Sequence, residues 1–95
     1  MPSSHERGDL LPRIADGDRE AVGLAIERYG ALVWSMVRGV LGDGDLAEDA
    51  AQEVFIDLWT KAARFDGSKS SEASFVALIA RRRAIDVRRR ARRTR

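Results

Sequence analysis

The apolar residues of this chain recur at spacings of three and four from Leu10 to Val87, and this periodicity constrains the fold more than any other feature. Such spacing lines apolar side chains along one face of an α-helix, whereas a half-buried strand needs an alternation that no segment sustains. A chain of 95 residues has room for one modest core and not for two. The sequence therefore predicts one all-α domain over residues 1–95, a compact bundle of about four helices, with residues 1–8 flexible.

Two helices are expected in the first half of the chain, separated by the turn Asp16-Gly17-Asp18. Asp18 is a suitable N-cap for the second helix, which should reach Leu41 with a kink or a break at Gly30. The apolar residues of the first helix are Leu10, Leu11 and Ile14, and those of the second are Val22, Ile26, Tyr29, Val33, Val37 and Val40.

Two further helices are expected in the second half. Asp45 is a candidate N-cap because Glu48, three residues later, completes a capping-box pattern, and this helix should run to about Arg64. A polar loop over residues 65–71 follows, and a last helix should start near Ser71 or Glu72. Its expected core residues are Phe75, Val76, Ile79, Ala80, Ala84 and Val87.

The segment from Asp45 to Trp59 has two distinct faces when it is drawn at about 100° per residue. The apolar face, expected in the core, comprises Leu46, Ala47, Ala50, Ala51, Val54, Phe55, Leu58 and Trp59. The polar face comprises Glu48, Asp49, Gln52, Glu53 and Asp57, with Ile56 among them. An aliphatic residue surrounded by carboxylates and an amide is typical of a docking surface. Single exposed aliphatics also occur on ordinary solvated faces, so both interpretations stay open at this point.

Positive charge is concentrated at the C-terminal end. Residues 81–95 contain nine arginines and one acid, Asp86, a local net charge of +8; since the whole chain carries +2, the rest carries −6. An acidic body with an arginine-dense end suggests two partners, one basic or hydrogen-bonding and one polyanionic, although a merely solvated tail is the alternative. Residues 88–95 should form a basic helix end or a tail, because arginines surround the helix beyond Val87 and leave it no face to bury.

The composition argues against several classes of protein. The chain has no cysteine and one histidine, His5, so no metal site with Cys or His ligands is expected. No nucleophile–base pair or glycine-rich phosphate loop accompanies the carboxylates, which argues against an enzyme and against a bound cofactor. No signal peptide or long apolar run is present, so we expect a soluble, cytoplasmic protein without membrane insertion.

The chain resembles region 2 of bacterial sigma factors, specifically the extracytoplasmic-function (ECF) group. The segments that carry the resemblance, in the order and spacing of the family, are Gly17 to Ala21, Tyr29 to Val33, Ala47 to Trp59, Arg64 to Asp66 and Ile79 to Asp86. The family normally adds a C-terminal helix-turn-helix domain, region 4. This chain ends before that domain, which suggests a truncated piece of a longer protein.

The resemblance implies a role in transcription initiation and a partner for each charged region. In sigma factors the third helix docks on a coiled coil of the β′ subunit of core RNA polymerase, while the following loop and last helix bind the single-stranded minus-ten promoter element. The matching polymerase-binding residues are Asp49, Gln52, Glu53 and Ile56. The matching DNA-binding residues are Ser68, Lys69, Ser70, Ser71, Arg81, Arg82, Arg88, Arg89 and Arg92. An anti-sigma protein is a further partner that the family brings into consideration.

Three positions depart from the family pattern. Where the family most often has an aromatic, a tryptophan and an asparagine, this chain has Glu72, Phe75 and Arg82. Phe75 can still fill a core position. Glu72 would repel the phosphates of a strand bound beside it, and the missing asparagine removes an amide that could read a base edge.

Two other functions fit the residues without the resemblance. The first is a small helical adaptor, with an acidic protein-binding face and an arginine tail that binds nucleic acid nonspecifically. The second is a purely structural bundle, in which Trp34 and Trp59 serve the core. Stoichiometric binding to core RNA polymerase separates a sigma domain from both.

Overall fold

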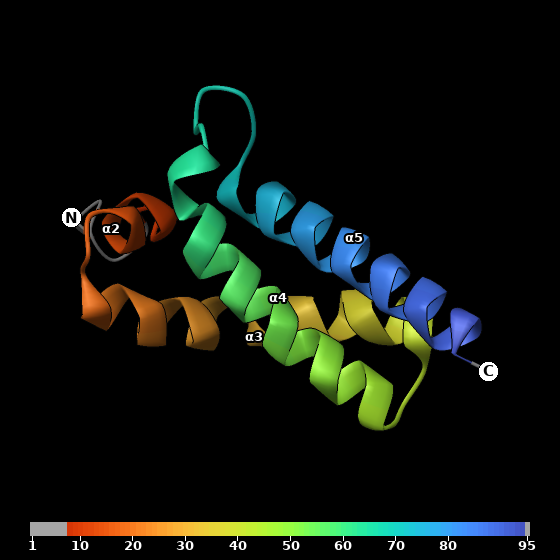
Figure 1. Cartoon of the computed structure of the whole chain (residues 1–95). Coiled ribbons are helices and arrows are strands. Elements are labelled where there is room, and N and C mark those ends of the chain that lie inside the picture. The colour runs from red at the N-terminus through yellow and green to blue at the C-terminus, as the bar shows by residue number, and fades with distance from the viewer. Residues whose placement is uncertain (1–7, 95) are drawn as a thin grey trace.

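The computed structural model describes residues 8–94, and all the regular elements in that range are helical (Figure 1). They are α2 (Leu11–Ala15), α3 (Arg19–Leu41), α4 (Asp45–Lys61), the short 3-10 helix η1 (Ala62–Arg64) and α5 (Glu72–Arg93). The three long helices pack on one another, and α2 lies against η1 and α3. The loop over residues 65–71 reverses the chain, so α4 and α5 lie side by side in opposite directions. The expected all-α bundle is confirmed.

Side chains cap two of the long helices; the cap at Asp18 was predicted, and Ser71 stands where the last helix was expected to start. Asp18 accepts hydrogen bonds from the backbone N–H groups of Glu20 at 3.0 Å and Ala21 at 3.4 Å. Ser71 accepts one from the N–H of Ser74 at 3.1 Å and so starts α5. Because each cap pairs an N–H group that the first turn leaves without a helical partner, it fixes where its helix begins.

The capping box expected at Asp45 is wrong. Gly44 is the N-cap of α4, no side chain caps the helix, and Asp45 is already helical. Gly44 has a φ of 137°, a backbone conformation that a residue with a Cβ rarely adopts, and this lets the chain turn into the helix one residue early. Asp45 and Glu48 therefore lie in the first turn, where carboxylates stabilise the helix through its dipole.

The buried seam of α3 differs from the expected one. It consists of Ala21, Ala25, Tyr29, Val33 and Val37, each four residues after the last, and the helix is unbroken at Gly30. Ile26, expected in the core, is 43% exposed. The small side chains of Ala21 and Ala25 can occupy the contact line where helices approach closely, which turns the neighbouring isoleucine outward.

The core faces of α4 and α5 follow the sequence pattern more closely. The expected residues that are buried are Ala47, Ala50, Val54 and Leu58 on α4, and Val76, Ile79, Ala80, Ala84 and Val87 on α5. Phe75 and Trp34 are partly buried against this core. Leu46 and Trp59 were expected in it, but they are 47% and 38% exposed. None of the helices described here is long and apolar enough to cross a membrane.

Candidate functional site

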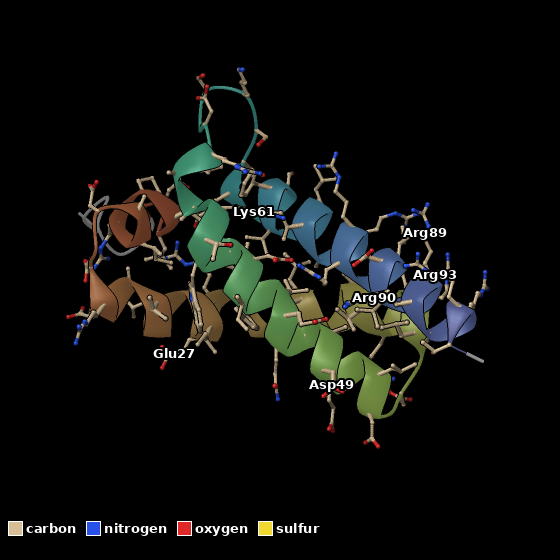
Figure 2. All side chains as sticks on the ribbon, viewed as in Figure 1. Glu27, Asp49, Lys61, Arg89, Arg90 and Arg93 are labelled. Carbon is tan, nitrogen blue, oxygen red and sulfur yellow. The ribbon has the colours of Figure 1, made fainter. Side chains whose placement is uncertain are left out.

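The outer face of α4 carries the apolar residue that sequence analysis placed among acids. Asp49, Gln52 and Ile56 are all exposed, Ile56 at 52%, and Figure 2 shows Asp49 pointing away from α5. Trp59 follows Ile56 by three residues, so it lies on the same side of the helix. We refer to Asp49, Gln52, Ile56 and Trp59 as the docking face. At about 100° per residue Trp59 lies beside Gln52, seven residues earlier, on the polar side of the helix, and it was assigned to the core because its side chain is apolar.

Glu53 lies apart from the docking face. Its carboxylate accepts a hydrogen bond from the Arg90 guanidinium at 3.3 Å, across the interface between α4 and α5. Both side chains are more than a third exposed. Of the four expected polymerase-binding residues, the structure therefore gathers three on one outward surface, and it places the fourth at the edge next to the arginine helix.

A second acid of α4, Asp57, is buried although the sequence pattern put it on the polar face. Arg83 donates to both of its oxygens, from Nε and Nη2, at 2.7 Å each. The hydrogen bond to Asp57 raises the pKa of Arg83 above its already high ordinary value. Asp86 lies 3.5 Å from the guanidinium groups of both Arg83 and Arg90. These contacts form a continuous ladder of alternating charge between the two helices, which comprises Glu53, Arg90, Asp86, Arg83 and Asp57.

The remaining arginines of α5 divide into exposed and partly buried side chains. The exposed ones are Arg81, Arg82, Arg89, Arg92 and Arg93. Figure 2 shows Arg89 and Arg93 projecting away from the bundle. Arg88 differs, because it is partly buried and its Nε atom is enclosed without a hydrogen-bond partner. Of the five arginines expected to bind DNA, four are thus presented to solvent and Arg88 is only partly so.

Asp66 organises the loop that connects η1 to α5. Its carboxylate accepts hydrogen bonds from the N–H group of Ser68 at 2.9 Å and from its hydroxyl at 2.6 Å, and these bonds lower the pKa of Asp66. Its carbonyl accepts from the N–H groups of Lys69 and Ser70. Of the four expected DNA-binding residues here, Ser68 and Ser71 use their hydroxyls locally, while the side chains of Lys69 and Ser70 are exposed.

A groove of about 270 Å³ lies between the end of α4, η1 and residues 75–86 of α5. Phe75 and Ile79 contribute apolar surface to it, and the Phe75 ring also contacts Phe65, with 5.4 Å between centroids. The charged side chains that line the groove are Asp57, Lys61, Arg64, Arg82, Arg83 and Asp86. Figure 2 shows Lys61 at the end of α4 beside α5. Arg83 is already held by Asp57, so the cations next to the apolar surface that suit a planar ring attached to a phosphate are Lys61, Arg64 and Arg82.

Two cations of this groove, Lys61 and Arg64, were not predicted from the sequence. The predicted DNA-binding residues lie only in the arginine-dense end of the chain and in the loop. The available signal was that Lys61 and Arg64 lie directly before the loop, three residues apart, so they occupy one side of the chain where it enters that loop.

Glu72 does not lie beside the groove as a surface charge. It is 3% exposed, and its carboxylate accepts hydrogen bonds from the backbone N–H of Leu11 at 2.7 Å and from the hydroxyl of Tyr29. Arg28 Nη1 lies 3.8 Å from the same carboxylate. Burial and the hydrogen bond to Glu72 raise the pKa of Tyr29 to about 12. Glu72 was expected on the surface beside a bound strand, and the structure instead buries it among these three partners.

Within residues 8–94, no cluster of acidic and histidine side chains could hold a metal ion. His5 lies outside the described residues.

The chain resembles known proteins over most of its length. It is 31% identical over 83 residues to the ECF RNA polymerase sigma factor SigK of Mycobacterium ulcerans, an alignment that covers 87% of this chain and 44% of that protein. It is 34% identical over 77 residues to the protein of the same name from Mycolicibacterium vanbaalenii, which covers 81% and 39% of the two chains. This chain therefore spans less than half the length of these relatives. No solved structure matches it. Residues 25–94, which include all of α4, η1 and α5, match the family described as sigma-70 region 2, and the chain belongs to that family.

Proposed function

We propose that this chain is the region 2 domain of an ECF-type sigma factor, which binds core RNA polymerase and the non-template strand of the minus-ten promoter element during transcription initiation. The observation that carries the proposal is the separation of two chemically different surfaces on adjacent helices. The docking face of α4 combines an acid, an amide and two apolar side chains, whereas α5 and the groove beside it expose cations. Both partners can therefore be bound at once, in the cytoplasm where the polymerase works.

The docking face suits a coiled coil of the polymerase β′ subunit. Ile56 and Trp59 supply the apolar centre that a protein interface needs, and exposed aromatic residues are enriched among the side chains that dominate binding energy. Asp49 and Gln52 supply acceptors for basic or polar residues of the partner. Glu53 is a weaker candidate contact, because it lies at the edge of α4 that faces α5 and not on the docking face.

The groove and the loop suit a single strand with one base turned out. Phe75 and Ile79 offer an apolar surface for the base, and Lys61, Arg64 and Arg82 are placed to contact the neighbouring phosphates. The exposed loop residues Lys69 and Ser70 can read base edges, since phosphate contacts alone carry no sequence information. Extrusion of a base costs a few kcal/mol, which these contacts must offset.

The polymerase arm of the proposal is tested by Ile56→Arg. A charged side chain at the centre of the docking face should weaken binding to a β′ coiled-coil fragment by at least about tenfold, as measured by calorimetry. Helical content should stay unchanged, because Ile56 is 52% exposed. Ile26→Arg is the matched control, since Ile26 is an isoleucine of α3 with 43% exposure. Equal loss of affinity in the two variants would contradict a specific docking face.

The DNA arm is tested with minus-ten oligonucleotides, each altered at one position. Sequence reading predicts one position whose substitution costs about 1–3 kcal/mol, and replacing Lys69 or Ser70 by Ala should reduce that cost. Arg89→Ala combined with Arg92→Ala should lower the log–log salt slope by about 0.7 per lost phosphate contact. The control, Arg19→Ala with Arg38→Ala, removes two arginines of α3 and should leave the slope unchanged. Uniform affinity across the oligonucleotides would favour a nonspecific helical adaptor instead.

A further inference from the structure

Glu72 stands at the junction between the loop and α5. It is the first residue of α5, and the loop ends at the residue before it. Its carboxylate is 3% exposed and accepts hydrogen bonds from two other parts of the chain, the N–H of Leu11 at 2.7 Å and the hydroxyl of Tyr29. The first of these partners is 61 residues away along the chain and the second 43. One side chain therefore joins the starts of α2 and α5 to the middle of α3.

The contact with Leu11 supplies the side-chain hydrogen bond that the N-terminus of α2 lacks. Leu11 is the first residue of α2, and the N-cap residue Leu10 offers no side-chain hydrogen bond. Leu10 and Leu11 are both buried, at 1% and 0% exposure, so water cannot easily pair their backbone groups. Glu72 pairs the N–H of Leu11, and the start of α2 is thereby tied to the first turn of α5.

That same segment also touches the middle of the loop. The backbone carbonyl of Gly8 accepts a hydrogen bond from Arg28 at 2.7 Å, and a Cβ atom at Gly67 would stand 3.3 Å from Asp9 Oδ2. Burial and the charge of Glu72 raise the pKa of Asp9. Asp9 therefore lies close to the loop at Gly67, and Leu11 is hydrogen-bonded through Glu72 to the position where the loop joins α5.

A buried carboxylate is a costly way to fill space, since an apolar side chain would need no hydrogen-bond partners. A carboxylate differs from an apolar side chain in that its hydrogen bonds are directional, because each oxygen must meet a donor at a fixed distance and angle. An apolar residue at this position could pack in several orientations with similar energy. At Glu72 the two donors and the cation Arg28 select one orientation for the start of α5.

We propose that Glu72 is a positioning residue that sets the orientation of the loop over residues 65–71 by anchoring its end to Leu11 and Tyr29. The loop then presents Lys69 and Ser70 to a bound strand in one fixed arrangement, which discrimination between bases requires. This role in sequence reading rests on the proposed function, whereas the anchoring of the loop does not. Phosphate binding by the exposed arginines of α5 is independent of the anchor, because they lie further along the helix.

The test compares Glu72→Ala, Glu72→Gln and Tyr29→Phe in the full chain, with Glu27→Ala on the exposed side of α3 as the control. Amide hydrogen exchange is measured across the chain, and binding is measured to the single-position oligonucleotides described above. Glu72→Ala should speed exchange selectively in residues 8–15 and 66–74. It should also reduce base discrimination from roughly 5- to 150-fold in the parent to below about threefold, with the salt slope unchanged. Glu72→Gln keeps an acceptor for Leu11 and should retain most of the discrimination.

Tyr29→Phe keeps the ring in the core and removes one donor, so it should give an intermediate effect even where Glu72→Ala folds poorly. Exchange that rises uniformly along the chain in the Glu72 and Tyr29 variants would overturn the proposal, because it would show a role in global stability alone. Faster loop exchange with unchanged discrimination would overturn it as well. A parent that binds every oligonucleotide equally would refute the promoter-reading function, and the exchange measurement would then decide by itself whether Glu72 anchors the loop.

Discussion

Two carboxylate–guanidinium pairs connect α4 to α5, and they differ sharply although their residue types are alike. Asp57 and Glu53 are one helical turn apart on α4. Asp57 is held by Arg83 through two hydrogen bonds of 2.7 Å, whereas Glu53 meets Arg90 once, at 3.3 Å. The side chains of the first pair are 10% and 25% exposed, and those of the second are 38% and 47% exposed.

The difference shows that position relative to the core, and not residue type, decides how much an ion pair contributes to stability. A bidentate pair shielded from water holds two helices in register, because loss of one partner leaves a charge without compensation. A single contact in water contributes little and exchanges readily with other partners. The contact between Glu53 and Arg90 can therefore be replaced by contacts with a binding partner at a small cost in free energy. The contact between Asp57 and Arg83 cannot.

The largest expected effect is that of Asp57→Ala. This substitution should lower the free energy of unfolding by about 1.5–3 kcal/mol, because Arg83 loses two short hydrogen bonds and keeps only the 3.5 Å contact with Asp86. Glu53→Ala should change it by less than about 0.5 kcal/mol. Urea unfolding followed by circular dichroism measures both. A double variant with Asp57→Leu and Arg83→Met should recover much of the loss, and similar losses in the two alanine variants would remove the distinction between the pairs.

A smaller effect is expected in the pH dependence of stability, which should differ between the Tyr29–Glu72 contact and the Arg83–Asp57 contact. Glu72 accepts from Tyr29, whose pKa of about 12 lies above its ordinary value of 10.0. A raised pKa means that the folded state holds the proton more tightly, so this contribution to stability is complete below pH 10 and declines as pH rises towards 12. The stability difference between the parent and Tyr29→Phe should therefore shrink over that range. The difference between the parent and Asp57→Ala should not, because the pKa of Arg83 is raised further above an already high value.

The smallest expected effect concerns salt. A double-mutant cycle on Glu53 and Arg90 should give a coupling energy below about 1 kcal/mol at low salt and close to zero at 0.5 M NaCl, since exposed charges are screened. The corresponding cycle on Asp57 and Arg83 should keep most of its coupling energy. If salt reduced both coupling energies in the same proportion, burial would not be what distinguishes the two pairs.

Local sequence signals predicted the helices and much of the core, but not the polar residues inside it. The caps Asp18 and Ser71 act on N–H groups two or three residues away, so a short window of sequence contains both partners. Asp57 is buried because Arg83, 26 residues later, meets it. No helical periodicity within α4 could reveal that partner, and the same holds for Glu72 and Leu11. Trp59 was misplaced for a different reason, since its apolar side chain was given more weight than its position beside Gln52 on the polar side of the helix.

The continuity of α5 as far as Arg93 has a consequence for how its charges act. At a rise of about 1.5 Å per residue, Arg82, Arg89 and Arg93 form a row on one side of the helix that is about 16 Å long. A disordered tail of the same composition would lose backbone freedom each time it met a polyanion. Here that entropy is lost once, on folding, so the three arginines keep a fixed spacing that any polyanion binding along the row would have to match.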